Sequence, residues 1–197
     1  RPAAANALPT RRLDAMYATP ARDYIQARNG AVKTVAPAKI LVDGGRVAMV
    51  AADGRSWKSP IVISAVPWFA LADVFDGDVA PLAPLLDAAR RTAACPIVTV
   101  NLWFDRPVLD EPFVGLPGRT MQWVFDKRLV VGDAASHLTL VSSRASEVVG
   151  LSNSDLIELA PDELTSAIPA AAEARVLNAT VVREPRATFS LAPGQPP

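Results

Sequence analysis

The stretch "IVTVNLWFD", residues 97–105, decides the fold class of this 197-residue chain. Its side chains alternate between two sets, as they do in a β-strand whose two faces meet different surroundings. One face would carry Val98, Val100, Leu102 and Phe104, and the other Thr99, Asn101 and Trp103. We therefore predict a long strand with these two faces.

Three later stretches continue the strand pattern, and helical spacing appears both before and between the strands. The strands are "MQWVFD" (121–126), "HLTLVSS" (137–143) and "VLNATVV" (176–182), with the Gly/Pro-rich "VGLPGRT" (114–120) as a turn. Helices are expected over 68–75, 83–94 and 154–168, the last kinked or split at Pro161. Strand runs mixed with a few helices predict an α+β fold, with a mixed, mostly antiparallel sheet and helices on one face.

The N-terminal third reads as a helix followed by a small β-meander. We expect a helix over 13–28, ended by a left-handed cap at Gly30. The meander strands are "VKTVAP" (32–37), "AKILV" (38–42), "RVAMVAA" (46–52) and "IVISAV" (61–66), the last buried on both faces. Asp43-Gly44 and Asp53-Gly54 are hairpin signals.

This reading divides the chain into four segments. They are an N-terminal helical segment (1–30), a β-meander (31–67), a larger sheet domain (68–184) and a return segment (185–197). Both ends are loose in composition, so we expect the chain to be the middle of a longer protein.

Composition excludes several classes of function. Lys plus Arg and Asp plus Glu number 20 each, and no basic run appears, which argues against nucleic-acid binding. The single cysteine, Cys95, allows no intrachain disulfide and favours a reducing, cytoplasmic location. One Cys and one His cannot supply a zinc site, so no metal is expected. No apolar run is long enough to span a membrane.

No local motif identifies a catalytic residue, so the catalytic residues stay unknown at this stage. No GxGxxG follows a strand, and the phosphate loop of nucleotide triphosphatases is missing. His137 shows no obvious acidic or hydroxyl partner nearby in the sequence, and we interpret it as a surface or structural histidine.

Five stretches, in order, carry a resemblance to a known family. They are "LVDGGRVAMVAADG" (41–54), "IVISAVPW" (61–68), "PIVTVNLWFDRPVLDEPFVGL" (96–116), "MQWVFDK" (121–127) and "VVREPRATFSLAPG" (181–194). Together they resemble the squalene-associated FAD-dependent desaturases, also called hydroxysqualene dehydroxylases, within the flavin-dependent amine oxidase and phytoene desaturase superfamily. The resemblance covers most of the chain from Tyr24 onward.

The resemblance implies a flavoenzyme of hopanoid biosynthesis, of which this chain would be the middle part. The cofactor would be FAD, with the backbone near Ala38 beside its adenine, although the family has valine there. FAD would not be held by this chain alone, which would be inactive. The whole enzyme would be cytoplasmic and able to associate peripherally with a membrane, and the isolated chain could self-associate. Arg183, Glu184 and Arg186 would form an ion-pair latch between domains.

The resemblance also implies a substrate with almost no polar groups, an isoprenoid such as hydroxysqualene, reduced to squalene. Affinity for such a molecule comes from buried apolar area, which aromatic side chains supply. We predict that Trp103, Gln122, Trp123 and Phe125 line its site, with Gln122 on the face opposite Trp123. The alternative for each aromatic is an ordinary core position.

Two other classes of function remain open on the sequence. One is oxidation of an amine or a carotenoid by the same fold. The other is a non-enzymatic module that binds an apolar ligand or another protein.

Overall fold

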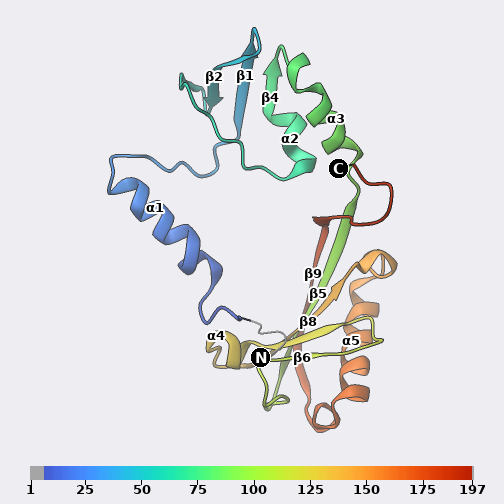
Figure 1. Ribbon diagram of the computed structural model, residues 1–197. Coiled ribbons are helices and arrows are strands. Elements are labelled where there is room, and N and C mark those ends of the chain that lie inside the picture. The colour runs from blue at the N-terminus through green and yellow to red at the C-terminus, as the bar shows by residue number, and fades with distance from the viewer. Residues whose placement is uncertain (1–6, 197) are drawn as a thin grey trace, which may run out of the picture. The chain divides into compact units, whose positions relative to one another are not determined.

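The computed structural model describes residues 7–196, which form two compact units. The first unit comprises residues 7–29 and 95–188, and the second comprises residues 30–94 and 189–196. Each unit contains one β-sheet (Figure 1). The helices and the mostly antiparallel sheets confirm the α+β class, and the smaller sheet is mixed.

The second unit is built on a four-stranded sheet in the order β3-β2-β1-β4. Its strands are β1 (Ala38–Asp43), β2 (Arg46–Ala52), β3 (Arg55–Trp57) and β4 (Phe75–Gly77). Strand β4 runs parallel to β1, and the other pairs are antiparallel. The remaining elements are α2 (Trp68–Val74), η2 (Ala80–Leu82) and α3 (Ala83–Arg91).

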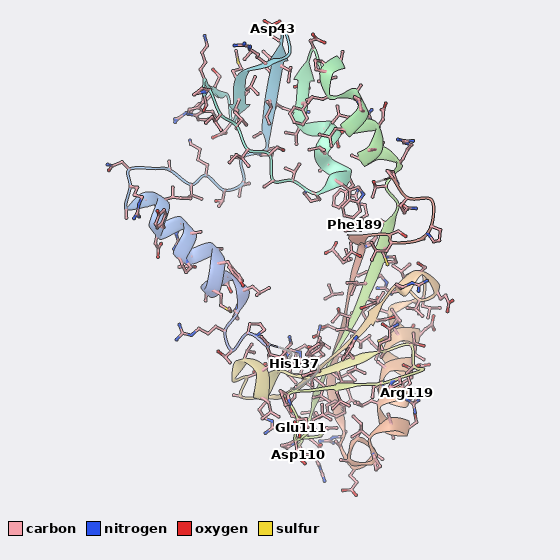
Figure 2. All side chains as sticks on the ribbon, viewed as in Figure 1. Asp43, Asp110, Glu111, Arg119, His137 and Phe189 are labelled. Atoms are coloured by element: carbon pink, nitrogen blue, oxygen red, sulfur yellow. The ribbon has the colours of Figure 1, made fainter. Side chains whose placement is uncertain are left out.

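Both predicted hairpins are confirmed. The β1–β2 turn has left-handed φ angles of 53° at Gly44 and 73° at Gly45, and Asp43 marks its tip in Figure 2. The β2–β3 turn repeats this with 51° at Asp53 and 67° at Gly54. Two successive left-handed residues match the right-handed twist of the strands that they join.

Two predicted strands of this unit are wrong. Residues 32–37 are irregular because Val35 takes a left-handed φ of 55° and is fully exposed. Residues 61–66 form no strand, and Ile61 and Ile63 are largely exposed, because the place beside β1 belongs to β4. An apolar run indicates that a segment is suited to burial, but it does not show which strand the segment will pair with.

The first unit is built on a five-stranded sheet in the order β6-β7-β8-β5-β9. The strands are β5 (Ala94–Phe104), β6 (Phe113–Gly115), β7 (Trp123–Asp126), β8 (Ser136–Ser143) and β9 (Val176–Phe189). All four strands predicted for this sheet are present in it. Sequence reasoning missed only the short strand β6, and it ended β9 too early. Pro185 fits inside β9 because β9 is an edge strand, where a residue without an N–H need not remove a hydrogen bond between strands.

The described part of the first unit contains six helical elements. They are η1 (Asp14–Ala18), α1 (Thr19–Gln26), α4 (Lys127–Val131), η3 (Ala145–Glu147), α5 (Asn153–Ala167) and η4 (Pro169–Glu173). The predicted N-terminal helix starts in a π-helical turn, and its left-handed end lies at Asn29 rather than Gly30. Helix α5 is one continuous helix through Pro161, against the expected split.

The core of the first unit lies between one face of the sheet and α5. Leu156, Ala160 and Leu164 of α5 are fully buried at helical spacing. They pack in one cluster with the alternate strand residues Val98, Val100, Leu102, Phe104, Val124, Leu138 and Leu140. The predicted alternation of β5 is thereby confirmed, and the side chains between these positions point to the other side of the sheet. None of the described helices combines the length and the apolarity needed to cross a membrane.

The boundary that the sequence suggested at residue 67 does not coincide with a boundary between the two compact units. The compact second unit extends to residue 94 and includes α2 and α3, which the sequence reading grouped with the larger sheet domain. Helix α2 packs against β1 and α3, so it belongs to the smaller sheet.

Candidate functional site

The candidate site is the side of the five-stranded sheet that faces away from α5, here called the aromatic face. It is defined by Thr99, Asn101, Trp103, Phe113, Trp123, Phe125, His137, Thr139 and Val141. Strand register arranges these residues in rows that run across the sheet. Phe113, Phe125, Thr139 and Asn101 form one row, and Gly115, Trp123, Val141 and Thr99 form the next.

The β6–β7 side of this face is aromatic. The rings of Phe113 and Phe125 stack with centroids 5.9 Å apart, and Phe113 lies 6.1 Å from Trp123. Gly115 lies opposite Trp123, and a Cβ at this position would make an ordinary van der Waals contact with the indole, at 3.5 Å. Trp123 is 41% exposed, so one side of its ring is available for contact. A wide apolar surface of this kind suits a ligand that offers little besides apolar area.

The β5–β8 side of the same face carries a chain of polar contacts. Asp133 Oδ2 lies 3.1 Å from His137 Nδ1, and His137 Nε2 lies 3.1 Å from Asn101 Oδ1. The hydroxyl of Thr139 donates to the same Asn101 oxygen at 2.8 Å. Trp103 stacks on the imidazole at 4.2 Å between centroids. His137 is labelled in Figure 2, at the end of the sheet next to α4.

These contacts change the interpretation of His137, for which the sequence showed no partner. Its carboxylate partner, Asp133, lies in the loop before β8, four residues away. The hydrogen bond from His137 lowers the pKa of Asp133 below its ordinary value. Asn101 was assigned to the face of Trp103 from alternation, but its pairing with β8 depends on strand register, which the sequence does not reveal.

The N-terminal segment of the chain borders this face. Ala7 and Leu8 line a hollow of about 320 Å³ together with Phe113, Trp123 and Phe125. A second hollow of about 620 Å³ lies between residues 9–14, α4 and His137. The aromatic face is therefore grooved, with room beside the rings for a slender ligand.

The four residues predicted to line a substrate site do not all lie together. Trp103, Trp123 and Phe125 share the aromatic face. Gln122 is apart from them, and its amide makes two hydrogen bonds of 3.1 Å with the backbone of Ser143. Both polar ends of the Gln122 amide are therefore already used. Contact of any of the four with substrate stays a prediction.

A carboxylate from the opposite side of the sheet fixes the start of β7. Glu163 of α5 accepts hydrogen bonds from the backbone N–H of Thr120 at 2.9 Å and of Met121 at 2.7 Å. These residues belong to the turn that leads into Trp123. The helix behind the sheet thus positions the aromatic side chain in front of it.

Arg183, within β9, makes its side-chain hydrogen bonds inside its own unit. Arg183, predicted as part of an interdomain latch, donates to the backbone oxygens of Val149 and Leu151 and to the side chain of Asn153. These partners lie within the same unit, at the start of α5. Arg183 therefore anchors β9 to the N-terminus of α5.

The second unit offers one place for a flat ring near Ala38. Ala38 begins β1 and borders a hollow of about 420 Å³ lined also by Ala31, Lys33, Ala36, Ala52 and Trp57. The alanines let a planar group approach the strand backbone, and Trp57 offers a ring face. Lys33 Nζ lies 5.4 Å from the centroid of that ring, where it could meet a phosphate. These residues fit the adenine end of a dinucleotide.

Solved structures of several other proteins have a fold similar to that of this chain. The chain is similar to an oxidoreductase from Methanosarcina mazei, with a TM-score of 0.64 and 21% identity, over 82% of this chain and 40% of that one. It is similar to putrescine oxidase bound to putrescine, with a TM-score of 0.59 and 18% identity, over 74% and 33%. Reduced UDP-galactopyranose mutase gives 0.55 and 12% identity, over 70% and 32%.

These likenesses establish the fold, and the chain spans less than half the length of each of these proteins. No curated protein sequence gives a significant match. The model of one protein family, described as flavin containing amine oxidoreductase, matches residues 13–195, nearly the whole chain. The chain therefore belongs to the flavin-containing amine oxidoreductase family.

Proposed function

We propose that this chain forms the substrate-binding part of an FAD-dependent oxidoreductase that acts on a long isoprenoid alcohol such as hydroxysqualene. The observation that carries the proposal is the aromatic face, where Phe113, Trp123 and Phe125 lie together and Trp123 remains 41% exposed. The resemblance of residues 41–54, 61–68, 96–116, 121–127 and 181–194 to hydroxysqualene dehydroxylases supports the substrate class.

The reaction would be reductive removal of a hydroxyl group to give squalene. Bound reduced flavin would supply a hydride to the carbon that the hydroxyl leaves, and the hydroxyl would depart with a proton as water. The aromatic face would hold the hydrocarbon chain and exclude water from the reacting carbon. The hollow beside Ala38, Lys33 and Trp57 would hold the adenine end of FAD.

Oxidation of an amine is the second candidate, because putrescine oxidase shares the fold. A diamine needs anionic or carbonyl groups to hold its two ammonium ends. The one carboxylate in the polar chain of contacts on this face, Asp133, is already engaged by His137. A largely apolar face with this one polar side favours an isoprenoid alcohol over a diamine.

The test uses the whole protein that contains this chain, purified with its flavin. After anaerobic reduction of the flavin, addition of hydroxysqualene should restore the absorbance of oxidised flavin and yield squalene, detected by gas chromatography. Putrescine, added to the oxidised enzyme in a parallel cuvette, should leave the flavin spectrum unchanged. Reduction of the flavin by putrescine, with no response to hydroxysqualene, would replace this proposal with amine oxidation.

A further inference from the structure

The side-chain amide of Asn101 is held at its oxygen end only. Its oxygen accepts from the Thr139 hydroxyl at 2.8 Å and faces His137 Nε2 at 3.1 Å. Both contacts lie at the oxygen end of the amide. Asp133 and Trp103 fix the imidazole in turn, through its other nitrogen and its ring face. The plane of the Asn101 amide is therefore set by its neighbours.

The other end of that amide has no partner among residues 7–196. No hydrogen bond involves Asn101 Nδ2 within the described chain, and the only buried side-chain nitrogen or oxygen found there without a partner is Nε of Arg128. Nδ2 therefore keeps some contact with solvent. It lies in the middle of β5, in one row with Thr139, Phe125 and Phe113.

A fixed, unused donor beside an aromatic surface selects for an acceptor in an otherwise apolar ligand. Leaving such a donor unpaired under an apolar ligand costs its lost hydration, whereas a ligand oxygen at that point restores a hydrogen bond. The preference is strongest where the site group is held in place before binding. Phe113 and Phe125 in the same row would receive the hydrocarbon next to that oxygen.

We propose that Asn101 anchors the single oxygen of a long apolar ligand, with Thr139 and the Asp133–His137 pair as positioning residues. The ligand class is an isoprenoid alcohol, and the inference rests on the proposed function. Asn101 thereby distinguishes the alcohol from the hydrocarbon product, which lacks the oxygen and leaves the site more readily.

The binding test compares hydroxysqualene with squalene, which differ by one hydroxyl, each titrated into the whole protein from the same detergent. Wild type should bind hydroxysqualene roughly 10-fold or more tightly than squalene, the value of one well-placed hydrogen bond. Asn101→Leu should abolish that preference and leave squalene affinity unchanged or improved. Thr165→Val is the control, because it removes an exposed hydroxyl from α5, on the other side of the sheet, and it should keep the preference.

A second measurement on wild type does not depend on the folding of a variant. The side-chain 15N–1H signals of Asn101, assigned by their loss in the Asn101→Asp spectrum, should shift with hydroxysqualene and stay in place with squalene. Equal affinity for both ligands in wild type, a preference that survives Asn101→Leu, or an unmoved Asn101 signal would overturn the anchor while leaving an apolar site intact. Failure of both ligands to bind would overturn the proposed function together with the anchor.

Discussion

Replacing Trp123 by alanine tests whether this side chain belongs to a ligand-binding surface or to the core. A fully buried tryptophan covers roughly 150–250 Å², but Trp123 is 41% exposed, so about 90–150 Å² is covered. At about 25 cal/mol per Å², and allowing for the area that alanine keeps and for a compact unfolded chain, the loss should be about 2 kcal/mol. Leu140 is smaller but fully buried against α5, and Leu140→Ala should cost about 3–5 kcal/mol because a cavity remains.

Urea unfolding of both variants measures these free energies, and hydroxysqualene titration measures the other half of the prediction. If the ligand covers the exposed part of the ring, Trp123→Ala should weaken binding roughly 10- to 50-fold. Phe189→Ala is the control, since Phe189 is an aromatic residue that is 55% exposed but belongs to the other unit, and it should leave hydroxysqualene affinity unchanged. A stability loss at Trp123 as large as that at Leu140, or undiminished ligand affinity, would show that the ring serves the fold.

Three further predictions concern the charge, the cofactor and the helix cap. Asp133→Asn should destabilise the protein at about pH 6 and much less at about pH 3, as measured by urea unfolding. The folded state lowers the pKa of Asp133 below its ordinary value of 3.8, so the charged carboxylate stabilises the fold above that pH, and this stability is lost as the pH falls through the folded-state pKa. An equal loss of stability at both pH values would contradict this. The isolated chain should bind FAD more weakly than about 1 μM in calorimetry, because the hollow at Ala38 offers the adenine end alone and no helix N-terminus for the pyrophosphate. Ser152→Ala should cost about 1 kcal/mol in urea unfolding, since it removes the bond to the N–H of Asp155 at the start of α5, while Ser146→Ala, in a position without such a bond, should cost much less.

The strands that carry their own periodicity could be predicted from the sequence. In β5 the alternation of Val98, Val100 and Leu102 with Thr99 and Asn101 fixes both the element and its buried face. The same alternation indicates on which face of their strands the side chains of Trp103, Trp123 and Phe125 lie. These features depend on neighbours within a few residues, so the local sequence specifies them.

Features that depend on distant partners could not be predicted. Ile61 and Ile63 look like a buried strand, but whether they are covered depends on which segment pairs with β1. The contact of His137 with Asn101 joins residues 36 positions apart and exists only because β5 and β8 pair in one register. A shift of that register by one residue would move the two side chains to opposite faces.

The carboxylate of Glu163 limits how this fold can vary among related chains. Both of its oxygens are used by adjacent N–H groups of one turn, at Thr120 and Met121. Glutamine offers only one acceptor oxygen, and aspartate is one carbon shorter, so neither can serve both groups from the same place. The length of the 116–122 turn, the position of α5 and the residue at 163 must therefore change together. We expect these three features to covary, and with them the position of Trp123 that the turn determines.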